Sequence, residues 1–152
     1  MSERSPAKQV EELLATVAEA LGLDADVEVT ETPGEIRAVL HGDDLGLFIG
    51  RHGQTIDAVQ HLAFKLAART STPPPKVEVD AAGYRARRRQ ALERQADEAA
   101  DDALRTRRPV ALDAMSATER KVVHEYLKDR EGVETYSEGT EPDRHLVVSP
   151  LD

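Results

Sequence analysis

Hydrophobic and polar positions follow two different periods in the first third of the chain. Apolar residues spaced at i, i+3, i+4 and i+7 over residues 7–21 predict an amphipathic helix, and Gly22 is placed to end it. Residues 26–31 and 36–40 alternate between apolar and polar instead, with a Pro33-Gly34 turn between them. The pattern therefore predicts a helix followed by a β-hairpin.

The helical period returns after the hairpin and is interrupted by glycines. Asp43 or Asp44 is expected to cap a short helix that ends at Ile49, and a second helix is expected after Gly53. Three consecutive prolines then exclude helix, and the alternating residues 76–80 predict a strand. The first eighty residues thus predict the order helix, strand, strand, helix, helix, strand.

A different pattern begins at Tyr84. Residues 84–108 contain no glycine or proline and predict one long helix. Ser116 and Glu119 match a capping box, which predicts a second helix that ends near Arg130. Two alternating segments, residues 133–138 and 145–150, predict a terminal hairpin. The apolar stripe of the long helix is expected to contain Leu92, Ala96, Ala99, Ala100 and Leu104.

The two halves of the chain predict an α+β fold of two small domains. The pattern changes between Asp80 and Tyr84, so we expect one domain over residues 1–80 and a second over residues 81–152. The second is expected to pack its helices on a small sheet.

Composition limits the chemistry that the chain can perform. The 152 residues include no cysteine, which excludes disulfides, thiolate nucleophiles and zinc sites with sulfur ligands. Aromatic residues make up only 3%, which limits stacking on nucleic-acid bases. No apolar run approaches the ~20 residues of a membrane span, and the N-terminus lacks the apolar region of a secretory signal. We expect a soluble cytoplasmic protein with no membrane insertion.

The formal net charge of −9 argues against indiscriminate binding to nucleic acid, but the charge is uneven. Residues 85–108 hold eight arginines against five acidic residues. Exposed charges separated by more than a Debye length, ~8 Å at physiological salt, are largely screened from one another. A local anion-binding site is therefore compatible with an acidic chain.

Residues 46–56, GLFIGRHGQTI, place two large polar side chains between two glycines. A purely structural explanation is that Gly50 ends one helix and Gly53 begins the next. The functional alternative is that a sugar-phosphate chain approaches this backbone closely, while Arg51 and His52 point outward to phosphate. The segment matches neither of two common nucleotide-binding motifs. Its glycine spacing differs from that of the dinucleotide-binding fingerprint, and Gln54-Thr55 stands where a P-loop has Lys followed by Ser or Thr.

The segment LFIGRHGQTIDAVQHL resembles the core of a KH domain, whose GXXG loop clamps about four nucleotides of single-stranded RNA. The element order resembles the bacterial type II KH fold, which implies a three-stranded sheet with helices on one face over residues 8–80. By this resemblance Ile49 and Ile56 are buried beside the loop, and the strand at residues 36–40 borders the groove for the bases. The loop residues expected to contact nucleic acid are Gly50, Arg51, His52, Gly53 and Gln54.

Arg120 and His124 lie four residues apart and hence on one face of the predicted helix. An isolated pair of this kind is usually a solvated face, and as an acid–base site it lacks a neighbouring nucleophile or metal cluster. Asp57 and His61 are a candidate pair of metal ligands with equally little support. Residues 108–150, however, resemble the R-x-x-x-H ("R-three-H") domain, which binds single-stranded nucleic acid. The resemblance implies that Arg120 and His124 donate to phosphate or base.

The arginine-rich start of the long helix has two interpretations. Arg85, Arg88 and Arg89 could contact RNA between the two domains. They could equally pair with acids or cover apolar surface with their stems.

A KH domain followed directly by an R-x-x-x-H domain is the arrangement of the Jag (SpoIIIJ-associated) family of bacterial RNA-binding proteins. Jag proteins often carry a further N-terminal domain and linker, which we expect this chain to lack because it begins at the KH helix. The resemblance implies a non-catalytic protein without cofactor or metal that binds single-stranded RNA, with single-stranded DNA as another ligand and a small KH protein as a companion.

Two other classes of function stay open at this stage. A protein-interaction adaptor that uses the KH fold as a dimer or partner surface fits the acidic charge. A hydrolase or nuclease has less support, because Asp57 is the only carboxylate near the loop in sequence. The oligomeric state, the RNA sequence preference and the pathway do not follow from these residues.

Overall fold

The computed structural model describes residues 4–152. It contains two compact units, of which the first ends at Arg85 and the second begins at Ala86. The fold class is α+β, as predicted, with one three-stranded sheet in each unit.

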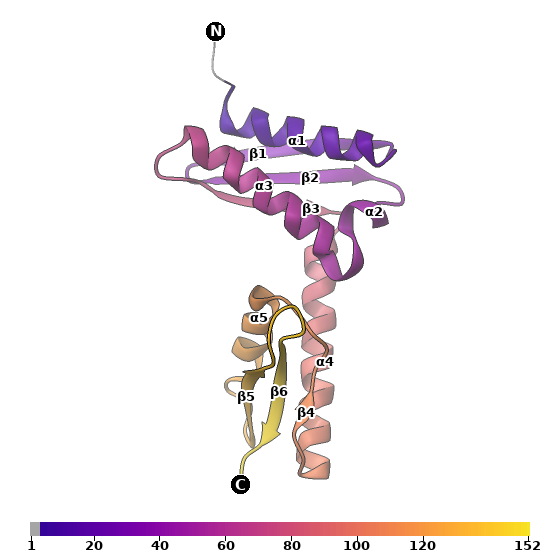
Figure 1. Cartoon of the computed structure of the whole chain (residues 1–152), viewed down its shortest axis with the longest axis vertical. Helices are drawn as coiled ribbons and strands as arrows, with labels where there is room; N and C mark the ends of the chain where they lie inside the picture. Colours follow the sequence, from indigo (N-terminus) through magenta and orange to yellow (C-terminus); the bar gives the residue numbers. More distant parts are fainter. Residues whose placement is uncertain (1–3) are drawn as a thin grey trace. The chain divides into compact units, whose positions relative to one another are not determined.

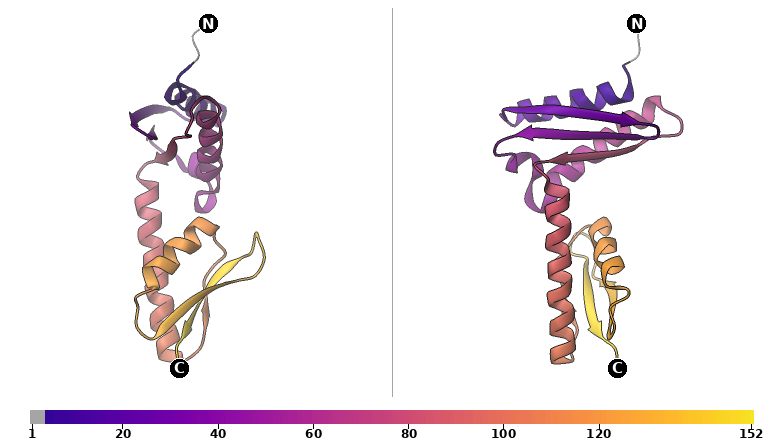
Figure 2. Two further views of the ribbon diagram at one scale, coloured as in Figure 1. Left: turned by 90° about the vertical axis from the view of Figure 1, so that its left-hand side faces the viewer. Right: turned by 180° about the vertical axis from the view of Figure 1, so that it is seen from behind.

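The first unit is built on a sheet of order β1-β2-β3 with β2 in the centre. β1 (Ala25–Thr32) pairs antiparallel with β2 (Glu35–Gly42), and β2 pairs parallel with β3 (Lys76–Ala81). Helices α1 and α3 lie together on one face of this sheet (Figure 1), and the view from behind shows its opposite face (Figure 2). The helical elements are α1 (Pro6–Ala20), α2 (Gly46–Ile49), the short 3₁₀ turn η1 (Arg51–Gly53) and α3 (Gln54–Thr70).

Local signals set the ends of several elements. α1 begins where the Ser5 hydroxyl accepts a hydrogen bond from the Lys8 N–H, with Pro6 at the start of the helix. The predicted aspartate cap of the short helix was wrong. Leu45 occupies the cap position of α2 and has no side-chain group that could accept a hydrogen bond, while Asp44, with a φ of 51°, lies in the preceding loop. A helix of one turn is held here by packing and not by its cap.

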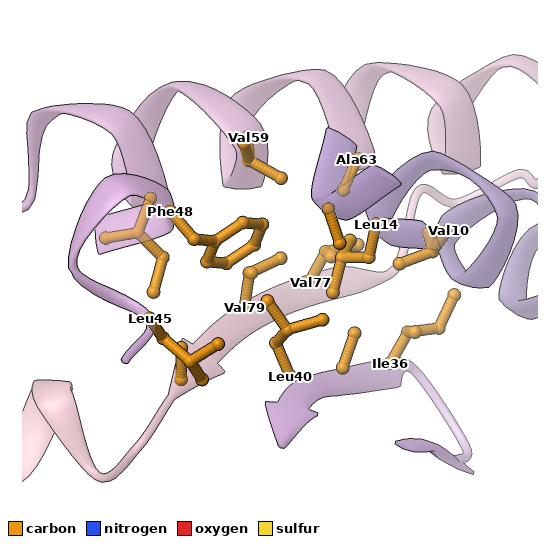
Figure 3. Packing of buried hydrophobic residues seen from close by; sticks show 14 of the residues in the cluster. Val10, Leu14, Ile36, Leu40, Leu45, Phe48, Val59, Ala63, Val77 and Val79 are labelled. Atoms are coloured by element: carbon orange, nitrogen blue, oxygen red, sulfur yellow. The ribbon is translucent and has the colours of Figure 1, made fainter. Parts of the chain in front are cut away.

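Phe48 fixes α2 in the core of the first unit. Its ring is fully buried and lies near Val59 of α3 and Val79 of β3 (Figure 3). Burial of an aromatic side chain of this size stabilises the fold by about 2–3 kcal/mol. Because Phe48 lies two residues before Gly50, this packing fixes where the glycine-flanked loop begins. The cluster includes Val10, Leu14, Ile36, Leu40, Leu45, Phe48, Val59, Ala63, Val77 and Val79.

The strand at residues 36–40 lies in the centre of the sheet, and its place beside a groove for the bases stays a prediction. β2 is the central strand, and its apolar side chains Ile36, Ala38 and Leu40 are buried beneath the helices. The edge strand on the α3 side is β3. Ile56 is fully buried as expected, whereas Ile49 is half-buried and packs against the edge of the cluster.

The second unit packs α4 and α5 against an antiparallel sheet of order β4-β6-β5. Ser116 caps α5 by accepting a hydrogen bond from the Glu119 N–H, as the capping box predicted. α5 ends at Leu127, three residues earlier than expected, and Leu104 is 37% exposed while Ala103 takes its place in the core. The elements are α4 (Tyr84–Thr106), β4 (Val110–Ala111), α5 (Ala117–Leu127), β5 (Val133–Glu138) and β6 (His145–Pro150).

Candidate nucleic-acid interface

The loop from Gly50 to Gly53 has an unusual backbone. The φ angles of Gly50, His52 and Gly53 are 75°, 54° and 77°. Residues other than glycine rarely adopt positive φ angles of this size. α2 ends at Ile49, and the N–H of the next residue, Gly50, donates to the Gly46 carbonyl at 2.8 Å. Arg51 and His52 are exposed and Gly53 is buried, as the outward orientation of the two polar side chains requires.

Both glycines are required by internal packing as well as by φ. A Cβ atom on Gly50 would lie 2.8 Å from the Cβ and backbone nitrogen of Thr55. A Cβ atom on Gly53 would lie 2.8 Å from Cε1 of Tyr84. The purely structural and the functional explanations of the glycines are therefore compatible, since the same tight loop projects Arg51 and His52.

α3 begins directly after the loop without a side-chain cap. Gly53 occupies its cap position in the left-handed conformation, and the Gln54 N–H donates to the Arg51 carbonyl. The positive end of the helix dipole and the first N–H groups of α3 thus lie beside Arg51 and His52. Gln54 is exposed on the first turn. This arrangement favours an anion at the loop.

Arg85 lies between α3 and the edge strand β3. Its guanidinium donates to the Asp57 carboxylate at 2.5 Å, to the Gln60 amide oxygen at 3.0 Å and to the Val79 carbonyl at 3.1 Å. The same Gln60 oxygen accepts from the Val79 N–H at 2.9 Å. Arg85 therefore cross-links two elements of the first unit, and its direct contact with RNA stays a prediction.

The other two arginines of the predicted basic run lie in the second unit. Arg88 makes two hydrogen bonds to the Glu119 carboxylate, at 3.0 and 2.8 Å, and both side chains are less than a fifth exposed. Arg89 is 70% exposed and pairs with Glu93 one turn along the helix at 3.3 Å. Of these two, Arg89 is the more accessible to a ligand.

Arg120 and His124 line an open pocket of about 440 Å³ between α5 and the β5–β6 hairpin. Lys121 and Arg144 add two cationic side chains to the same pocket. The walls also include Thr135, Ser137 and Leu146. Because three basic side chains and an imidazole line the same pocket, it suits an anion such as phosphate.

Arg120 and His124 differ in their surroundings although they share one helix face. Arg120 is only 8% exposed, and its guanidinium donates to the Met115 carbonyl at 2.6 Å and to Glu141 at 2.9 Å. His124 is exposed, and its Nδ1 is hydrogen-bonded to the Thr135 hydroxyl. The other ring nitrogen of His124 is then the one left for a ligand. Arg120 has a structural role beside its predicted binding role.

The presence of Lys121 and Arg144 in this pocket was not predicted from the sequence. Lys121 follows Arg120 directly, and the helical spacing rule that selected Arg120 and His124 passes over it. Arg144 comes from the β5–β6 connection and donates to the Gly139 carbonyl at 2.6 Å, a placement that no local pattern signals.

Of the candidate metal pair Asp57 and His61, the aspartate already has a side-chain partner. Asp57 is bound to Arg85, and residues 4–152 contain no group of three His, Asp or Glu side chains that could hold a metal ion. Within the same residues, no helix is long and apolar enough to cross a membrane.

Both compact units match known protein families. A family model described as the KhpA/KhpB KH domain matches residues 8–80, and one described as the R-three-H domain matches residues 90–150. RNA-binding protein KhpB of Bacillus subtilis (strain 168) is 35% identical over 146 residues, which are 95% of this chain and 70% of that protein. The chain belongs to the KhpB family. This is the Jag family predicted from the two motifs.

Two further KhpB relatives cover the same region. RNA-binding protein KhpB of Clostridium symbiosum is 38% identical over 91% of this chain, and that of Lactiplantibacillus plantarum is 40% identical over 90%. The chain spans 63% and 42% of the length of these two proteins. The loop lies within the KH match and Arg120 and His124 lie within the R-three-H match, whereas Tyr84 and Arg85 fall between the two.

Proposed function

We propose that this chain binds single-stranded RNA and that the Gly50–Gly53 loop holds the sugar-phosphate backbone. The observation that carries the proposal is the loop itself, which projects exposed Arg51 and His52 beside the uncapped start of α3. Backbone N–H groups, a helix dipole and a guanidinium at one place form a phosphate site. The relatives' name, RNA-binding protein, supports RNA as the ligand.

The pocket on α5 supplies a second contact with the same kind of strand. Lys121, Arg144 and the imidazole of His124 face an open hollow that accommodates a phosphate group. Two weak sites on one chain bind a single strand more tightly than either alone, because the second contact forms at a raised effective concentration. In this function the protein is a non-catalytic, cytoplasmic regulator of RNA, for which a small KH protein is a candidate companion.

The salt dependence of RNA binding tests this proposal. If Arg51, Lys121 and Arg144 each neutralise one phosphate, log Kd plotted against log salt should rise with a slope of about 2, at about 0.7 for each phosphate. The measurement is fluorescence anisotropy of a fluorescein-labelled, random-sequence 20-mer RNA from 50 to 300 mM KCl.

A stable RNA hairpin of the same length is the matched control. Its bases are stacked and its backbone is A-form, so it should bind at least tenfold more weakly than the single strand. An affinity that does not change with salt, or equal affinities for hairpin and single strand, would contradict the proposal.

A further inference from the structure

The aromatic ring of Tyr84 lies directly against Gly53. The ring atoms Cε1 and Cζ are 2.8 and 2.9 Å from the place that a Cβ on Gly53 would occupy. Tyr84 is half-buried and is the first residue of α4, outside the segment that matches the KH domain. One wall of the loop therefore comes from a residue that lies outside the KH family match but inside the first compact unit.

The loop depends on such support because its backbone is strained. His52 has a φ of 54°, and a non-glycine residue stays in this region only where its surroundings hold it there. Two side chains pack against the flanking glycines, Thr55 against Gly50 and Tyr84 against Gly53. Thr55 belongs to α3, the helix that follows the loop, whereas Tyr84 contacts the loop from a different element, α4.

The position of Tyr84 is fixed by its neighbours in the chain. The Asp80 carboxylate accepts hydrogen bonds from the Ala81 N–H at 2.8 Å and from the Arg85 N–H at 3.1 Å. The Arg85 guanidinium is bound to Asp57 on α3 and to the Val79 carbonyl on β3. The first turn of α4 is thus hydrogen-bonded both to β3 of the sheet and to α3, the helix that follows the loop.

We propose that Tyr84 is a positioning residue of the RNA-binding loop, which holds Gly53 and His52 in the conformation that receives the phosphate backbone. The proposal rests on the proposed function of the loop. A loop that is already in its bound conformation avoids the entropic cost of ordering on binding, so the ring raises affinity without touching RNA. The RNA-binding unit accordingly extends to Arg85.

Substitutions of Tyr84 in the full chain test the proposal. Tyr84→Phe keeps the ring and should bind the random-sequence 20-mer within about twofold of wild type. Tyr84→Ala frees the loop and should bind about tenfold more weakly, which corresponds to about 1.4 kcal/mol. Tyr84→Leu, which keeps apolar volume but loses the flat ring, should show the same loss and replaces Tyr84→Ala if that variant is not fully folded.

Tyr126→Ala is the matched control. It removes a half-exposed tyrosine from the second unit, where the phenol donates to Asp97, and should leave RNA affinity unchanged. Wild-type affinity in both Tyr84→Ala and Tyr84→Leu would overturn the proposal.

A double-mutant cycle with Gly53 separates loop positioning from a general loss of stability. Gly53→Ala in the wild-type chain forces a Cβ against the Tyr84 ring and also strains the backbone at φ 77°. In the Tyr84→Ala chain only the backbone strain remains, so the loss of affinity caused by Gly53→Ala should be at least about threefold smaller. Equal losses in the two backgrounds would contradict a direct contact.

A measurement without RNA distinguishes this proposal from the proposed function. Backbone ¹⁵N relaxation of free protein should show lower order parameters at Arg51 and His52 in Tyr84→Ala than in wild type and Tyr84→Phe. Unchanged order parameters would overturn the positioning role even if the loop binds RNA. Lowered order parameters would support it even if RNA bound elsewhere.

Discussion

Arg51→Asp combined with His52→Asp is expected to weaken the binding of single-stranded RNA about 100-fold. If the loop binds the backbone as proposed, each substitution removes a donor to phosphate and adds a negative charge. A hydrogen bond to a charged group contributes about 1.5 kcal/mol. Two such losses correspond to about two factors of ten in Kd. The measurement is anisotropy with the labelled 20-mer RNA.

The fold should survive this double substitution. Arg51 and His52 are exposed, and aspartate tolerates the left-handed backbone at position 52 better than most residues. Negative charge at the start of α3 also interacts favourably with the helix dipole. The matched control is His61→Asp with Arg69→Asp, which makes the same change in charge at exposed positions on α3. A folded double variant that binds RNA as tightly as wild type does would contradict the proposed role of the loop.

Arg120→Ala is expected to lower the free energy of unfolding of the chain by about 2 kcal/mol. Arg120 is only 8% exposed, and its guanidinium donates to the Met115 carbonyl. The substitution removes this donor, and a buried carbonyl that loses a hydrogen-bond partner destabilises the fold. The contact with Glu141 contributes less, because the Glu141 side chain is 60% exposed. Urea unfolding followed by circular dichroism measures the effect.

His124→Ala separates binding from stability in the same pocket. His124 is exposed and bound only through Thr135 among the hydrogen bonds described, so its loss should change the free energy of unfolding by about 0.5 kcal/mol or less. It should still weaken RNA binding about tenfold through the lost donor. Equal stability losses in Arg120→Ala and His124→Ala would contradict the different roles assigned to the two residues.

The sequence predicted the elements well because the hydrophobic period is a local property. The helical spacing that begins at Val10 and the strand alternation from Ile36 to Leu40 each report a buried face directly. Ser116 was identified by its distance to Glu119 along the chain. The short helix α2 has no such signal, since packing of Phe48 and not an aspartate cap holds it in place.

The sequence predicted the loop but not what supports it. A run of arginines gives no information on partners that lie far away in the chain, such as Asp57, 28 residues before Arg85, or Glu119, 31 residues after Arg88. Tyr84 was predicted only as the start of a helix, whereas its contact with Gly53 exists only in the folded unit. The order of strands in a sheet also cannot be predicted from the alternation of apolar and polar residues, which does not reveal that β2 is the central strand.

Amide chemical shifts during titration with RNA test the central claim most directly. The 152-residue chain, at 16.7 kDa, is small enough for ¹H–¹⁵N correlation spectra of every ordered amide. On addition of the single-stranded 20-mer, the largest shift changes are predicted at the amides of Gly50 to Thr55, with a second cluster from Arg120 to His124. Unchanged loop amides, with the largest changes on the edge strand β1 or at other positions remote from the loop, would contradict the account.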